Sequence, residues 1–227
     1  MKGTPSLVAE FLGTFFLCFA GIAAILSATS AVGSGAGIIG IALAHGLALS
    51  VAVNAFGGVS GAHFNPAVTI AALVTGRIQA PGAAAYIAVQ LAAATAAALI
   101  CANVFPPDAV AQANLGIPLP AAWATPATVF TFEFVMTFLL VIAIFGTALD
   151  PRGAVVKIGG FGIGLTVAFD ILAGGAVTGA SMNPARSFGP ALVQGHWEWH
   201  LFYWLAPIAG AITAALVYDN LILDTKT

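Results

Sequence analysis

Charge is what this sequence lacks most. Only 6% of its 227 residues are Asp, Glu, Lys or Arg, whereas 60% are apolar, and the mean hydropathy is +1.04. A soluble domain carries about 25% charged residues. We therefore exclude a soluble fold and expect a chain that lies in a lipid bilayer. The formal net charge of −2 also argues against nucleic acid as a partner.

Residues that carry chemistry are also scarce. The two cysteines, Cys18 and Cys101, lie in apolar runs without the spacing of metal ligands. We interpret both as small hydrophobic side chains that are buried in the protein. We find no nucleophile–base set, metal-ligand cluster or phosphate-binding loop in the sequence. We therefore expect no cofactor, no metal site and no enzymatic activity.

Long apolar runs are what the sequence has in abundance. A membrane-spanning helix needs about 20 mostly apolar residues, and six runs meet that length: about 6–27, 37–57, 82–103, 127–148, 157–175 and 199–222. Two further runs, about 66–76 and 184–194, are too short to span. A short helix at membrane depth must be re-entrant, with its non-helical part buried in protein or lining a cavity. The sequence predicts an all-α membrane protein with six transmembrane helices and two re-entrant half-helices.

Both short runs begin with the same three residues, Asn65-Pro66-Ala67 and Asn183-Pro184-Ala185. Proline is favoured at the first position of a helix because its missing N–H needs no partner there. Asparagine is a strong N-cap for the same turn. Each copy therefore predicts a loop that ends in a capped helix.

The two halves of the chain repeat each other. Glu10 and Thr14 in the first half match Glu133 and Thr137 in the second, within the pattern Glu-Phe-x-x-Thr-Phe. Three spans per half, an odd number, give the halves opposite orientations, and inverted repeats of this kind place a site at the membrane midplane. We expect one transmembrane domain over 1–227, with repeats at about 1–104 and 127–227 joined by an external loop at 104–126.

Lysine and arginine predict the orientation. With the N-terminus inside, five of the six fall in cytoplasmic segments: Lys2, Arg77, Arg152, Lys157 and Lys226. We therefore expect both termini in the cytoplasm and the chain in the inner, or cell, membrane. Arg186 is the exception. We interpret it as a fixed positive charge at the external mouth of a pore rather than as a snorkelling interfacial side chain.

Four other ionisable residues fall at membrane depth, where such groups are costly and suggest a function. Glu10 and Glu133 could relay protons or ions. We favour a structural role for both, because an unpaired loop amide is costly and each half needs the same support. His45 and Asp170 are more typical of packed residues, although Asp170 could also line a pore.

These features resemble the aquaporin, or major intrinsic protein, family over nearly the whole chain. The segments Ser60-Gly-x-His63-Phe-Asn-Pro-Ala-Val-Thr69 and Ser181-x-Asn-Pro-Ala-Arg-Ser187 carry the resemblance. It implies a six-helix bundle whose half-helices meet at the midplane. It also implies a homotetramer with one pore per subunit, and water, small neutral solutes and the lipid bilayer as partners.

The resemblance further implies a passive channel that excludes protons and ions. Asn65 and Asn183 would donate side-chain N–H groups to passing water, while the positive ends of two half-helices and Arg186 repel cations. Loop carbonyls would line one wall, from Gly61, Ala62, His63 and Phe64 in the first loop and Gly179, Ala180, Ser181 and Met182 in the second.

By the same resemblance, the selectivity filter falls on His45, Ile171, Ala180 and Arg186. This set is similar to that of plant tonoplast intrinsic proteins, several of which conduct ammonia. The glycerol-conducting branch of the family has Asp at the position of Ser187, so the chain resembles the water-conducting branch here. We expect a water channel that also passes ammonia or other small neutral solutes. A glycerol facilitator and an ion-coupled secondary transporter remain the alternatives.

Overall fold

Six long helices cross the structure, a computed structural model that describes residues 3–29, 37–153 and 158–223. They are α1 (Thr4–Thr29), α2 (Gly37–Ser60), α4 (Ala80–Val104), α6 (Pro126–Ile144), α7 (Gly159–Thr178) and α9 (Phe202–Val217). The helices α6 and α9 continue into π-helical turns, η2 (Phe145–Leu149) and η4 (Tyr218–Ile222). With these turns, all six are long and apolar enough to cross a membrane. The predicted all-α fold class is therefore confirmed.

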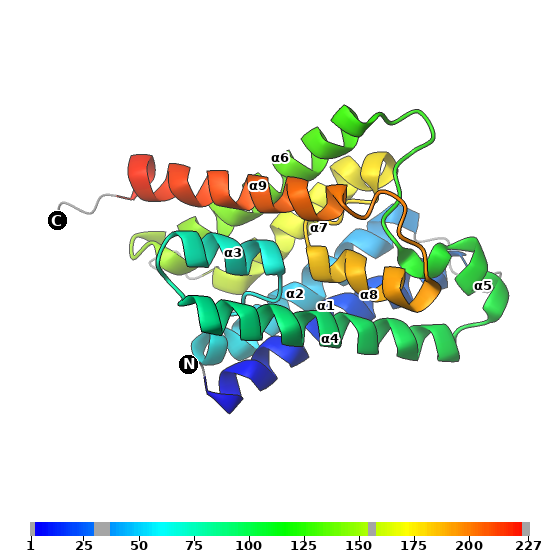
Figure 1. The fold of residues 1–227 in the computed structure, drawn as a ribbon, viewed down its shortest axis with the longest axis horizontal. Helices are drawn as coiled ribbons and strands as arrows, with labels where there is room; N and C mark the ends of the chain where they lie inside the picture. Colours follow the sequence, from blue (N-terminus) through cyan, green and yellow to red (C-terminus); the bar gives the residue numbers. More distant parts are fainter. Residues whose placement is uncertain (1–2, 30–36, 154–157, 224–227) are drawn as a thin grey trace.

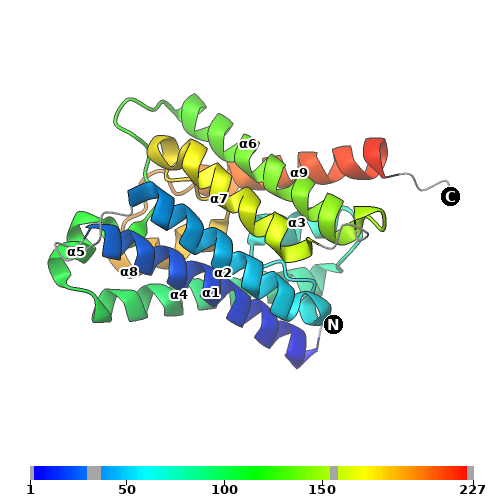
Figure 2. The same cartoon turned by 180° about the vertical axis from the view of Figure 1, so that it is seen from behind.

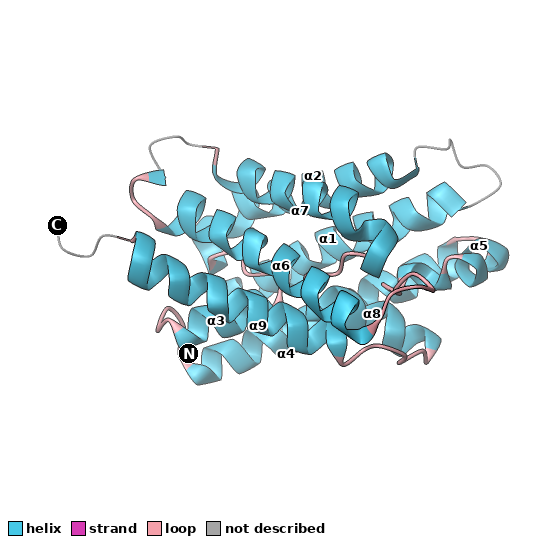
Figure 3. Ribbon diagram, turned by 90° about the horizontal axis from the view of Figure 1, so that it is seen from above, coloured by secondary structure: helices cyan, strands magenta, loops and turns pink. Residues whose placement is uncertain are grey.

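Two short helices lie inside the bundle. The helix α3 spans Pro66–Val74 and α8 spans Pro184–Gln194, close to the predicted limits. In Figure 1, α3 extends toward the end of the bundle where both termini lie, and α8 toward the end where α5 lies. The loops that precede them are enclosed among the helices (Figure 3), as buried non-helical backbone requires.

Close contacts between helix backbones hold the two halves together. The helices α2 and α7 lie side by side (Figure 2) and approach at Gly46 and Gly164. A Cβ atom added at Gly46 would lie 2.6 Å from the Gly164 carbonyl oxygen, and one at Gly164 would lie 2.1 Å from the Gly46 oxygen. Small residues of this kind allow helices in a membrane to pack backbone against backbone.

The segment between the repeats is more ordered than an external loop. Within 104–126 the structure has the helix α5 (Pro107–Gln112) and the 3₁₀ turn η1 (Asn114–Gly116). The connection expected at 104–126 therefore contains short helical elements. Leu115 explains the difference, because its fully buried side chain packs in a cluster with Ile22 and Leu26 of α1.

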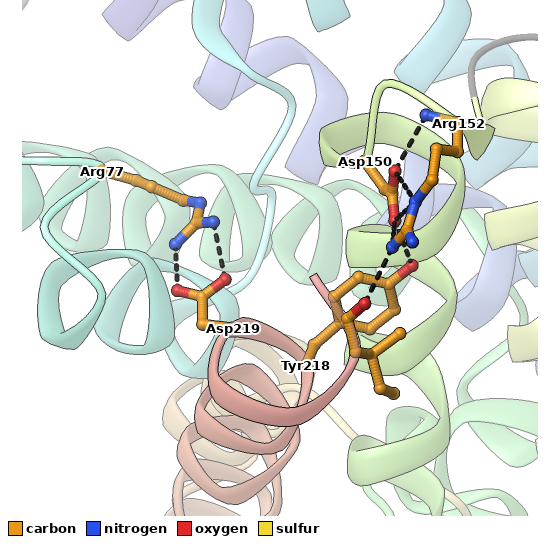
Figure 4. A network of polar contacts seen from close by, with 6 residues as sticks. Arg77, Asp150, Arg152, Tyr218 and Asp219 are labelled. Atoms are coloured by element: carbon orange, nitrogen blue, oxygen red, sulfur yellow. Dashed lines mark hydrogen bonds and ion pairs between the residues drawn. The ribbon is translucent and has the colours of Figure 1, made fainter. Parts of the chain in front are cut away.

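At the bundle end near the termini, an ion pair joins the turn after α3 to the C-terminal π-turn. The Arg77 guanidinium forms two hydrogen bonds with the Asp219 carboxylate, at 2.6 and 2.7 Å (Figure 4). It also lies 4.7 Å from the centre of the Phe145 ring. Arg77 thereby fixes the C-terminal end of α3 to α6 and α9.

Asp150 forms a second contact at the same end (Figure 4). Its carboxylate accepts hydrogen bonds from the Arg152 side chain, the shortest at 2.6 Å, and from the Tyr218 hydroxyl at 3.0 Å. Arg152 also donates to the Ile222 carbonyl at 2.8 Å. The hydrogen bonds from Arg152 hold the pKa of the Asp150 carboxyl well below its ordinary value. The other predicted cytoplasmic cations, Lys2, Lys157 and Lys226, lie outside the described residues.

Candidate pore and its constriction

Asn65 and Asn183 are joined by reciprocal hydrogen bonds between the two halves. The Asn65 Nδ2 group donates to the Met182 carbonyl at 2.8 Å, and the Asn183 Nδ2 group donates to the Phe64 carbonyl at 2.9 Å. A side-chain amide has two N–H donors. One is used in each cross-bond, so each asparagine retains a second N–H for another molecule.

The remaining amide atom of each asparagine caps its own half-helix. The Asn65 Oδ1 atom accepts from the Ala67 backbone N–H at 2.8 Å, and the Asn183 Oδ1 atom accepts from Ala185 at 3.0 Å. Because a backbone N–H only donates, the oxygen must face the helix and the nitrogen must face the opposite half. The predicted capped helix starts are present in both copies.

The loops before the asparagines adopt unusual backbone conformations. Ala62 and Phe64 have φ of 52° and 49°, and Ala180 and Met182 have φ of 45° and 54°. Positive φ is uncommon for residues with a side chain. Such strain persists where the surrounding structure over-determines it. The same alternation in both loops indicates that the same surroundings hold them.

Glu10 supplies those surroundings in the first half. Among the described residues, its fully buried carboxylate accepts four hydrogen bonds: from the Ser60 hydroxyl (2.6 Å), the backbone N–H groups of His63 (2.9 Å) and Phe64 (2.8 Å), and the Gln90 amide (2.8 Å). Two successive backbone N–H groups of the loop thus share one anionic acceptor.

Glu133 has the corresponding place in the second half. In the described part of the chain it accepts three hydrogen bonds, from the Thr178 hydroxyl (2.7 Å) and the backbone N–H groups of Ser181 (3.0 Å) and Met182 (2.8 Å). An ion relay would need a carboxylate that can exchange partners. The contacts of Glu10 and Glu133 instead favour a structural support for the loops.

Two tyrosines complete the support, and the sequence did not indicate either of them. The Tyr86 hydroxyl donates to the Ser60 carbonyl at 2.8 Å, and the Tyr203 hydroxyl donates to the Thr178 carbonyl at 2.5 Å. Each comes from the third long helix of its half. The only available signal was that both are aromatic residues with a polar tip in a membrane span.

A buried cavity lies beside the asparagines. It is lined by both asparagines and by residues of both loops: Ala62, His63, Phe64, Ala180, Ser181 and Met182. Aliphatic side chains form most of the remaining lining: Leu17, Leu49, Val53, Val68, Leu140, Ile144, Ile163 and Val167. One part of the wall is polar and the rest gives passing molecules no hydrogen-bonding partner.

A second cavity opens beside η1. His45, Ile171 and Arg186 line both cavities, and Ala180 lines the first. All four side chains are buried. The residues expected to form the filter therefore lie where the two cavities meet.

The polar groups of this junction are held in place by backbone carbonyls. The His45 Nδ1 atom lies 2.8 Å from the Ile41 carbonyl oxygen. Because a carbonyl only accepts, Nδ1 carries the proton and Nε2 is left as an acceptor in the neutral ring. The Arg186 Nη1 group donates to the Gly116 carbonyl at 3.1 Å. Gly116 lies in η1, and no sequence pattern indicated this contact because any residue can supply a carbonyl.

Asp170 lies next to Ile171 on α7 but lines neither of these cavities. Its side chain is buried, and its Oδ2 atom has no hydrogen-bond partner among the described residues. Cys18 and Cys101 pack in hydrophobic clusters. Within the same residues, no three His, Cys, Asp or Glu side chains are grouped so that they could hold a metal ion.

The chain is similar to known proteins over nearly all its length. Residues 2–218 match the family described as Major intrinsic protein. Aquaporin TIP4-4 of Zea mays is 42% identical over 224 residues, covering 96% of this chain and 86% of that protein. Probable aquaporin TIP3-2 of Arabidopsis thaliana is 41% identical over 233 residues, covering 96% and 84%. The X-ray structure of the aquaglyceroporin from Plasmodium falciparum has the same fold, with a TM-score of 0.84 at 20% identity over 96% of each chain.

Proposed function

Because this chain belongs to the major intrinsic protein family, we propose that it is a passive transmembrane channel for water. The observation that carries the proposal is the pair of cross-bonded asparagines beside a buried cavity. Each has one N–H left to donate to a passing water oxygen. A water that accepts from both is held in one orientation, so it does not continue a chain of donors and acceptors that could conduct protons.

Charge exclusion follows from the same geometry. The N-termini of α3 and α8 face the centre, and each carries a partial positive charge of about half an elementary charge. Arg186 adds a full positive charge at the junction of the two cavities. A cation that loses its water shell there meets positive potential, and none of the described residues that line the two cavities has a carboxylate to compensate it, so the cation is rejected.

Stopped-flow light scattering on proteoliposomes tests the water channel. Vesicles with folded protein should shrink in hyperosmotic buffer much faster than empty vesicles, with a low activation energy. Shrinkage no faster than that of empty vesicles, from protein that elutes as a single peak in detergent, would contradict the proposal.

A second proposed permeant is ammonia. The observation that favours it is the junction of His45, Ile171 and Ala180, in which the histidine offers an acceptor and the other two side chains are apolar. An ammonium gradient should make the vesicle lumen alkaline faster with the wild type than with His45→Phe or Ile171→His. Equal ammonia flux in all three would remove the filter argument. Glycerol flux in the same vesicles tests the related facilitator alternative.

An ion-coupled transporter is the alternative of a different class. It would need a coupling-ion site at the midplane, where this structure instead has two neutral asparagine amides. Saturable uptake that depends on an ion gradient would favour it. The proposed channel has no catalytic step, so flux should rise linearly with the gradient.

We also propose how the chain is organised in the membrane. The repeats at 1–104 and 127–227 form one channel unit, four copies assemble with one pore each, and both termini face the cytoplasm. The relatives give no support to the expected cell membrane. Light scattering coupled to size-exclusion chromatography tests the tetramer, and a fluorescent-protein fusion at each terminus tests the topology and the membrane.

A further inference from the structure

Gly21, in the middle of α1, lies directly against the tip of the His45 ring. A Cβ atom added at Gly21 would lie 2.1 Å from His45 Nε2 and 2.6 Å from both Cδ2 and Cε1. Real Cβ atoms essentially never come within 3.0 Å of another heavy atom. The imidazole therefore occupies the space that a side chain at position 21 would need.

The backbone gives no other reason for glycine at this position. Gly21 is not among the residues with positive φ, and α1 is helical from Thr4 to Thr29. Glycine inside a helix costs about 1 kcal/mol relative to alanine. The close approach of the His45 ring supplies a packing reason for glycine at this position.

The His45 ring has little freedom to move elsewhere. Its Nδ1–H group is bonded to Ile41 one turn earlier on α2, and the side chain is only 3% exposed. The space it does border is the junction of the two cavities, which it shares with Ile171 and Arg186. If the space above Gly21 were filled, the ring would have to shift by about 1.3 Å or more toward that junction, from 2.1 Å to an ordinary contact distance of at least 3.4 Å.

We infer that Gly21 sets the width of the constriction, because it allows the His45 ring to lie back against α1. Gly21 is a positioning residue that acts through His45 and touches no permeant in this scheme. The inference rests on the proposed role of His45 in the filter. It adds α1 to the elements that determine selectivity, although no expected filter residue comes from α1.

The test is the water permeability of Gly21→Ala in proteoliposomes. We expect it to fall at least about fivefold, because a pore close to the size of its permeant is sensitive to small changes in diameter. Gly57→Ala is the matched control. Gly57 is also a helix glycine, but nothing lies within 4 Å of its added Cβ atom, so its flux should equal that of the wild type.

A double variant shows whether the effect passes through His45. In the background of His45→Ala, adding Gly21→Ala should change water permeability less than about twofold, because the clashing ring is absent and the two changes are coupled. An equal loss in both backgrounds would show a merely structural role and overturn the inference. Unchanged flux in Gly21→Ala would overturn it as well.

If Gly21→Ala does not fold but the double variant does, the inference is tested instead by the size of the largest solute that the channel passes. His45→Ala should then pass urea faster than the wild type, and an unchanged cut-off would overturn the inference. Failure of the proposed function has a separate signature, since wild-type vesicles would conduct no water. Wild-type flux with an unaffected Gly21→Ala counts against this inference alone.

Discussion

The segments Ser60–Thr69 and Thr178–Ser187 hold their loops with the same parts in the same places. In each, a buried glutamate accepts from a hydroxyl and from two successive backbone N–H groups. A tyrosine donates to the carbonyl of the residue that begins the segment. An asparagine caps the half-helix and bonds to the opposite loop.

The two halves differ at two points. Val68 stands three residues after the first asparagine and Arg186 three residues after the second. Gln90, four residues after Tyr86, gives Glu10 its fourth donor, whereas Pro207 is four residues after Tyr203 and has no side-chain donor. The parts that shape the loops are therefore duplicated, while the charge that discriminates between permeants is present in one copy.

Removing the glutamates should have the largest effect. Glu133→Leu leaves three buried donors without their acceptor, and Glu10→Leu leaves four. Each unsatisfied group costs about 1–3 kcal/mol, and the sum approaches the total stability of a protein, about 5–15 kcal/mol. We expect no monodisperse protein in detergent from either variant. Glu198→Leu, at a 70% exposed carboxylate, should purify normally. Normal melting of either buried variant would refute the shared support.

Arg186→Val gives the second segment the residue of the first. Water permeability should persist, while the leak of protons and potassium should rise about tenfold or more because the fixed charge is gone. A pH-sensitive dye inside vesicles measures the leak. Arg77→Val removes an arginine that lines neither cavity and should leave the leak unchanged. An unchanged leak in Arg186→Val would show that the N-termini of α3 and α8 exclude ions without help from Arg186.

Gln90→Leu gives the first segment the three-donor support of the second. A hydrogen bond to a charged group contributes about 1.5–3 kcal/mol, so the melting temperature should fall by roughly 5 °C without loss of the fold. Asn103→Leu is the control on the same helix, because Asn103 is exposed and bonds only one turn back. A collapse of Gln90→Leu comparable to that of Glu10→Leu would show that three donors are too few in this half.

Tyr86→Phe and Tyr203→Phe test how alike the two supports are. Each removes one hydroxyl bond to a loop carbonyl, so each should cost about 1 kcal/mol in unfolding free energy. Thermal melting of the purified variants measures both. A difference of several kcal/mol between them would show that one half carries the support of both loops.

The smallest effect concerns the contacts of the half-helices. The end of α3 is held by the Arg77–Asp219 ion pair, whereas α8 contacts His200 through Phe188 in its middle. The Trp204 Nε1–H group donates to His200 Nε2 at 3.0 Å, which requires a neutral ring, and burial lowers the pKa of His200. This contribution is complete above the unfolded pKa of about 6.5 and is lost as pH falls below it.

Between pH 7 and pH 5 the melting temperature of the wild type should therefore fall by about 1–2 °C more than that of His200→Gln. The glutamine keeps an acceptor for Trp204 but does not titrate. Equal pH dependence of both proteins would show that protonation of His200 has no influence on stability.

Hydropathy, length and the two Asn-Pro-Ala starts predicted the six spans and the short helices, because these properties act locally along the chain. His45 and Ile171 were assigned to the filter by the family resemblance, and both lie at the junction of the cavities. Gln90 and the two tyrosines could not be predicted, since a single polar residue in a helix has no local signature. Gly116 acts through a carbonyl that every residue possesses.

The contact between Arg186 and the Gly116 carbonyl also bears on how such a chain could arise. Gly116 lies in η1, between α5 and α6, in the segment that connects the proposed repeats. Two identical half-chains paired around a twofold axis would lack this connection, and each would place the same residue at both mouths. Fusion of two half-chains into one gene removes that symmetry and creates a segment that can anchor an arginine at one mouth alone. In an ancestor of this kind, one-sided charge selection would therefore have followed fusion.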